Sequence, residues 1–207
     1  MAWQFDPTLY KYVNEDGDNL DSEYLLDLVY EDAENNEDEI EILAELLVLG
    51  LITLAAWIIA MRLIIEAEYI RMYLVAIGGL AMMTQEDWDN LATLLNEQYE
   101  YLDNFANDIA SGIMAFTIAA VAARAMLYLY SATQAFWIAI TSVAKAWGAT
   151  QERWITRQDK EVCPDCLAFE AEGWKPLGYF PVPGSATRCL SNCRCVLERR
   201  NADGVVF

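Results

Sequence analysis

The sequence has no histidine and few basic residues. Its 207 residues include 13 Lys and Arg against 32 Asp and Glu, a formal net charge of −19. Without histidine, neither a Ser-His-Asp or Cys-His nucleophile nor an H-E-x-x-H metal site can be built, and no G-x-x-x-x-G-K-[ST] phosphate loop is present. Phosphate contacts need clustered basic side chains. We therefore expect no enzymatic activity and no sequence-specific nucleic-acid binding.

The apolar run that most suggests a membrane span is too short for one. Residues 46–61 are sixteen residues without a charge, whereas a spanning helix needs about 20 apolar residues. A second run, residues 72–83, is shorter and contains Gly78 and Gly79. These runs favour helices buried in a bundle or a subunit interface. The alternative that remains is a membrane-associated helical protein with a zinc-binding cytoplasmic module, anchored through residues 46–61 and 113–123.

Charge divides the chain into three parts. Residues 1–45 hold 15 of the 32 acidic side chains and one base, Lys11, whereas from residue 150 onward eight acids meet eight bases. The acidic run at residues 31–39 is typical of a solvated tail that leads into a helix N-terminus. The more specific alternative is that these carboxylates bind the basic surface of a partner. We expect an acidic N-terminal segment at 1–40, a helical body at 41–148 and a cysteine-rich module at 149–207.

The middle of the chain has the pattern of long helices. Thr84 is a candidate N-cap followed by acids, and the apolar positions after it recur largely at three- and four-residue steps, as in an amphipathic helix that Gly112 ends or kinks. A last long helix is expected at about residues 113–147. With 56% hydrophobic residues, the chain can bury one core. The predicted fold is mainly α, a long-helix bundle with a small loop-rich C-terminal module held together by its cysteines.

All five cysteines lie between residues 163 and 195. They are Cys163, Cys166, Cys189, Cys193 and Cys195. The glycines and prolines between the two clusters stop helices, so we expect this segment to lack a core of regular elements. A C-x-x-C pair facing a second cysteine cluster is a common way to hold one tetrahedral zinc ion, because thiolates are soft ligands. We predict a structural zinc site.

Two other interpretations of the cysteines stay open. Disulfides would leave one odd thiol and would need an oxidising compartment, although the first residues lack the basic region of a signal peptide. A redox pair at Cys163 and Cys166 would need a βαβ pattern, which does not surround the short strand possible at residues 154–156. In a site built of four cysteines, Cys189 is the one we expect to be left over.

Three aromatic residues in the module are candidates for binding a partner protein. Trp174, Tyr179 and Phe180 lie between the two cysteine clusters. If exposed, they could form a recognition surface, since aromatic residues are enriched at binding hot spots. The competing interpretation is local packing around the metal.

Several motifs in order give the chain a family resemblance. They are residues 96–102 (NEQYEYL), 123–128 (ARAMLY), 150–154 (TQERW), 163–166 (CPDC), 173–174 (GW), 181–184 (PVPG) and 188–195 (RCLSNCRC). In this order they resemble the tailed-phage head morphogenesis proteins, the minor capsid proteins similar to the F protein of phage Mu. The resemblance covers about residues 84–200, and its specificity lies in the order of the motifs.

The resemblance implies a structural virion component, assembled in the host cytoplasm. Such a protein acts in procapsid assembly near the portal, with the portal or major capsid protein as partner, as a homo-oligomer, and the resemblance also admits a role in DNA packaging or ejection. Many members carry His-Pro ahead of the C-x-C pair, where this chain has Leu190 and Ser191. Cys189 would then replace the histidine as a ligand.

Overall fold

The chain is mainly helical. The computed structural model describes residues 4–6, 11–13, 36–190 and 193–206, without the side chains of residues 4–6, 11 and 12. Its elements in order are β1 (Gln4–Asp6), β2 (Lys11–Val13), a helix at residues 36–48, α2 (Leu54–Ile77), the 3-10 turn η1 (Leu80–Met82), α3 (Gln85–Ala110), α4 (Ile118–Ser131), α5 (Thr133–Ala146), β3 (Ala149–Ile155), α6 (Pro164–Ala171), β4 (Lys175–Pro176) and β5 (Val196–Asn201). The predicted fold class is confirmed. Most of the acidic N-terminal segment lies outside the described residues.

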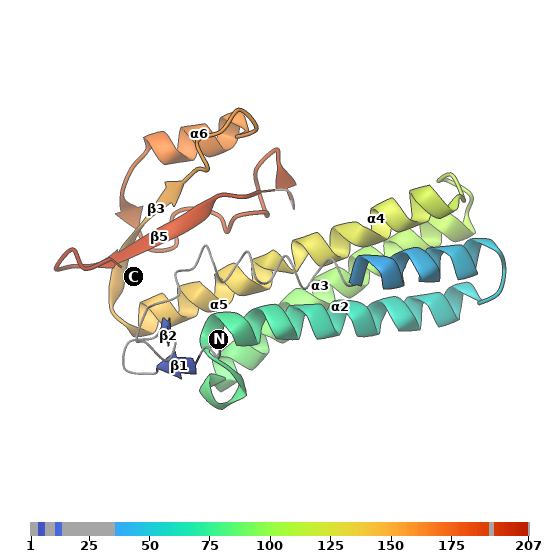
Figure 1. Cartoon of the computed structure of the whole chain (residues 1–207), viewed down its shortest axis with the longest axis horizontal. Helices are drawn as coiled ribbons and strands as arrows, with labels where there is room; N and C mark the ends of the chain where they lie inside the picture. Colours follow the sequence, from blue (N-terminus) through green and yellow to red (C-terminus); the bar gives the residue numbers. More distant parts are fainter. Residues whose placement is uncertain (1–3, 7–10, 14–35, 191–192, 207) are drawn as a thin grey trace.

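The helices form an elongated bundle, and the C-terminal module lies against one end of it. The helix at residues 36–48 and helices α2 to α5 run along the long axis (Figure 1), while β3, β5 and α6 lie together near the C-terminal end of α5. The connections at residues 49–53 and 111–117 lie at the opposite end of the bundle. At the N-terminus, β1 and β2 pair antiparallel, a hairpin where the sequence suggested only helix or acidic tail.

The sixteen-residue apolar run does not form one helix. The helix at residues 36–48 ends in a turn where Gly50 adopts a left-handed φ of 71°, and α2 begins after Thr53, whose hydroxyl accepts a hydrogen bond from the Ala56 N–H at 3.1 Å. A side chain at Gly50 would be strained at this φ. No helix in the described ranges is long and apolar enough to cross a membrane.

Helix α3 starts where the sequence predicted, whereas the last predicted helix is interrupted. Thr84 caps α3 with a full capping box, and Leu91, Leu102 and Phe105 are buried. The expected single helix at residues 113–147 instead begins at Ile118 and is broken at Ala132 into α4 and α5, which continue in nearly the same direction (Figure 1). Alanine-rich sequence continues across the break, so composition alone gave no signal for it.

The carboxylate of Asp87 joins three helices inside the bundle. Its Oδ1 accepts hydrogen bonds from the Tyr73 hydroxyl of α2 at 2.9 Å and the Ser142 hydroxyl of α5 at 3.1 Å. Its Oδ2 accepts from the N–H and the hydroxyl of Thr84 at 2.9 and 2.6 Å. Burial raises the pKa of Asp87, but these hydrogen bonds outweigh it and hold the pKa below its ordinary value.

The loop-rich C-terminal module also contains a three-stranded sheet, of which the sequence suggested only a short strand at residues 154–156. Strand β3 pairs antiparallel with β4 on one side and β5 on the other. Buried Glu152 on β3 faces Arg199 on β5, whose Nη2 donates to the Thr141 hydroxyl of α5 at 2.6 Å. Burial lowers the pKa of Arg199 to about 10, against the favourable charge of Glu152. This contact attaches the sheet to the bundle.

We expect Asp87→Asn to destabilise the helical bundle by about 2 kcal/mol at pH 7, because an amide cannot accept all four hydrogen bonds. Since the folded pKa of Asp87 lies below its ordinary value, its stabilisation is complete above about pH 4 and is lost as the pH falls through the folded pKa. Urea unfolding followed by circular dichroism at several pH values measures both effects.

Asp89→Asn is the matched control, because Asp89 is an exposed carboxylate on the same helix. It should change the free energy of unfolding by less than about 0.5 kcal/mol. Equal effects of the two substitutions would contradict the role of Asp87.

Candidate metal centre

Two chain segments bring the five cysteines together. Cys163 precedes α6 as its N-cap residue, Pro164 occupies the first turn, and Cys166 follows one turn later. Pro is favoured at this position because its missing N–H has no helical partner there. Cys189 comes from the loop after residue 184, and Cys193 and Cys195 lead into β5. The helix start thus presents one pair of sulfurs and the approach to β5 presents the other three.

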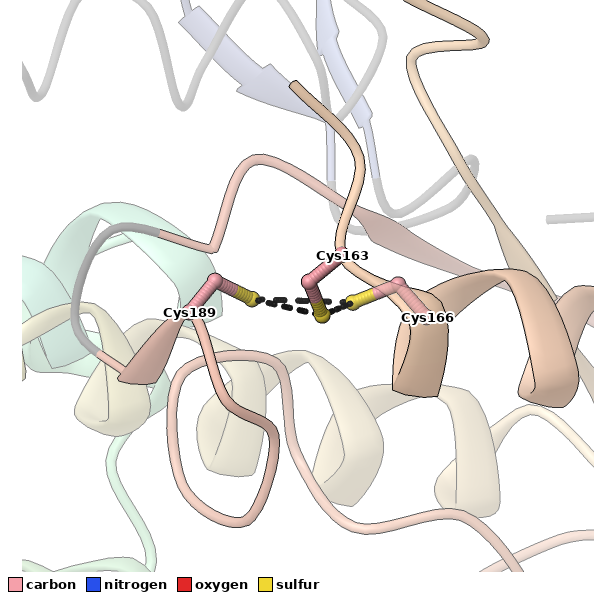
Figure 2. Close-up of side chains that lie close together, drawn as sticks. All are labelled: Cys163, Cys166 and Cys189. Carbon is pink, nitrogen blue, oxygen red and sulfur yellow. Dashed lines mark hydrogen bonds between the residues drawn. The ribbon is translucent and has the colours of Figure 1, made fainter. Parts of the chain in front are cut away.

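The sulfur atoms form two triads that share Cys166. One triad is Cys163, Cys166 and Cys189, and the other is Cys166, Cys193 and Cys195; within each, all sulfurs lie within 4.8 Å of one another. The Sγ of Cys163 is 3.4 Å from Cys166 and 3.6 Å from Cys189, and Cys166 is 3.6 Å from Cys189 (Figure 2). Cys166 and Cys193 are 3.8 Å apart.

The five residues are free thiols. Their separations are far longer than the S–S bond of about 2.0 Å, and the structure forms no disulfide among them. Cys166, Cys193 and Cys195 are buried, and Cys163 and Cys189 are half-buried. The arrangement can hold a metal ion through sulfur alone. Cys189, which we expected to be left over, lies as close to the C-x-x-C pair as any other cysteine.

The thiols polarise one another strongly. Burial raises the pKa of Cys166. Hydrogen bonding with Cys195 lowers the pKa of Cys193 to about 5, against the effect of burial, and the same contact raises the pKa of Cys195. A metal cation is favoured beside sulfurs packed this closely, because it stabilises their deprotonated form.

A shallow hollow opens beside the cluster. It is lined by Arg157, Glu161, Val162, Cys163, Cys166, Cys189, Arg194 and Cys195. Arg194 is held by ion pairs with Asp159 at 2.9 Å and Glu161 at 3.2 Å. The two arginines bring positive charge to the edge of the sulfur cluster. Sequence reasoning did not single them out, because their position depends on how the two cysteine segments meet.

The three aromatic candidates for partner binding have different environments. Phe180 is buried against Trp154 and Phe169, with ring centroids 6.1 and 5.7 Å away. It therefore belongs to the core of the module, and its side chain is not available to bind a partner protein. Trp174 is half-buried between the guanidinium groups of Arg153 and Arg200. Tyr179 is 52% exposed, and its hydroxyl donates to Glu172 at 2.8 Å.

Comparison of the chain with protein-family models, curated proteins and solved structures finds no match.

We expect Cys163→Ser to open the C-terminal module while the helices stay folded. A proposed sulfur ligand is lost, and only the strand pairing and the small aromatic core of residues 149–206 then hold the module together. Limited proteolysis with mass spectrometry should show cleavage within this module at least about tenfold faster than in the unaltered chain. A metal chelator should have the same effect on the unaltered chain.

Ala168→Ser is the control, since Ala168 is exposed on the same helix α6. It should leave the cleavage rate unchanged. Undiminished protection in Cys163→Ser, with the chelator also without effect, would contradict a stabilising metal.

Proposed function

We propose that this chain is a structural component of a tailed-phage head, a minor capsid or head morphogenesis protein whose C-terminal module holds one structural zinc ion. In this proposal it acts in procapsid assembly near the portal and performs no catalytic step. It assembles in the host cytoplasm, stays in the virion, and works as a homo-oligomer. A role in DNA packaging or ejection is compatible with this position.

The proposal rests mainly on the close approach of the two cysteine motifs in the structure. Residues 163–166 and 188–195 belong to the ordered motifs on which the resemblance rests, and their sulfurs lie 3.4 to 3.8 Å apart. A motif order that arose by chance would not require these distant segments to converge on one cluster. The convergence supports a module built around its cysteines.

Zinc fits the donor set better than other common metals. The cluster offers only sulfur, and thiolates favour zinc over magnesium or calcium. Four sulfurs at about 2.3 Å from a tetrahedral zinc ion lie about 3.8 Å apart, close to the separations measured here. Four thiolates and one Zn²⁺ leave a net charge of about −2. A site closed by four sulfurs is structural.

The bundle offers an apolar surface for a capsid partner at the end away from the zinc module. We call this surface the distal tip. It consists of the exposed apolar residues Leu49, Leu51, Ile113, Phe116 and Ile118, which lie in or next to the two connections at that end (Figure 1). Leu51 is 67% exposed and Ile113 is 77% exposed.

The charge pattern supports the distal tip as a contact surface. Residues 46–61 and 109–123 contain no charged side chain, although the chain carries a net charge of −19. Exposed apolar patches of this kind mark protein–protein contacts. The portal or major capsid protein can therefore approach here without meeting the acidic charge of the rest of the chain, and so can a second copy.

We expect the purified chain to bind the portal protein or the major capsid protein encoded in the same genome. The double substitution Leu51→Ser and Ile113→Ser should weaken that binding at least about tenfold, because it removes apolar area from the contact. Biolayer interferometry with each immobilised partner measures the effect.

Leu167→Ser is the control, since Leu167 is an exposed apolar residue on α6. It should bind as the unaltered chain does. Absence of binding to either partner would contradict the proposed function, whereas equal binding by the double variant would contradict only the assignment of the distal tip.

A further inference from the structure

Trp154 carries a buried hydrogen-bond donor beside the cysteine cluster. Its side chain is 0% exposed, and its Nε1 has no hydrogen-bond partner among the described residues. An indole N–H can only donate, and leaving such a group buried without an acceptor costs about 1–3 kcal/mol. Buried donors without partners are rare in folded proteins, so this one calls for an explanation.

The strand register directs Trp154 toward Cys195. Trp154 on β3 lies opposite Leu197 on β5. Side chains alternate between the faces of a strand, so Cys195, two residues before Leu197, is a diagonal neighbour of Trp154 on the same face. Both residues are buried.

Cys195 belongs to the sulfur cluster in two ways. Its sulfur forms a triad with those of Cys166 and Cys193, and the residue lines the hollow together with Cys163, Cys166 and Cys189. A thiolate bound to a metal keeps its negative charge and accepts a hydrogen bond far better than a thiol does. Donors of this kind to the ligands of a metal orient them and increase affinity. Metal binding at Cys195 would thus provide the acceptor that Trp154 lacks.

We infer that Cys195 is one of the metal ligands and that Trp154 is a positioning residue whose N–H donates to the Cys195 thiolate. This inference rests on the metal site of the proposed function.

Cobalt(II) titration of the full chain under reducing conditions tests this assignment, because its absorption bands report the number and environment of bound thiolates. Cys195→Ser should lose band intensity and bind at least about tenfold more weakly. Far-ultraviolet circular dichroism confirms that the helices remain folded in each variant.

Trp154→Phe tests the hydrogen bond separately, since phenylalanine keeps the aromatic contacts and lacks the N–H. It should weaken cobalt binding about tenfold and shift the thiolate-to-cobalt band. Trp57→Phe is the matched control: Trp57 is also fully buried with an unpartnered Nε1, but it lies in α2, where it packs against Phe105. It should change neither quantity.

The outcomes distinguish a failure of the metal site from a failure of the roles assigned to Cys195 and Trp154. Failure of the unaltered chain to bind cobalt or zinc would overturn the metal site itself, and the ligand assignment with it. Cobalt binding that is unchanged in Cys195→Ser would overturn the assignment of Cys195 alone. Identical bands and affinities in Trp154→Phe and Trp57→Phe would overturn the role of Trp154.

Discussion

The antiparallel pairing of β3 with β5 is the contact on which the C-terminal module depends. It joins residues 149–155, directly after the helical bundle, to residues 196–201, directly after the last cysteine. Glu170 of α6 then accepts hydrogen bonds from the N–H and hydroxyl of Thr156, at the end of β3, at 2.9 Å each. One strand pair thereby brings the start of α6 and the approach to β5 to the same place, and the five sulfurs meet there.

The two parts of the molecule are stabilised by different means. The bundle buries large side chains such as Trp57 and Trp137 and satisfies its buried carboxylate Asp87 with hydrogen bonds from three helices. The module has a small aromatic core around Trp154, and its remaining cohesion would come from a metal. The proposed metal site at one end and the apolar distal tip at the other would suit a protein that connects two parts of an assembly.

Local signals predicted the features that depend on neighbouring residues. Thr84 followed by acidic residues indicated the N-cap of α3, and the grouped cysteines indicated one cluster. The sheet could not be predicted, because residues 149–155 pair with a segment more than forty residues away across a stretch rich in glycine and proline. The burial of Phe180, for which the sequence left partner binding and local packing both open, and the orientation of Trp154 follow from that pairing.

The most direct test of the central claim is X-ray absorption at the zinc edge on the purified full chain. The account predicts about one zinc ion per chain with four sulfur neighbours at about 2.3 Å and no nitrogen or oxygen neighbour. A chain that contains no metal, or a zinc ion surrounded by oxygen and nitrogen, would contradict a module held together by its cysteines.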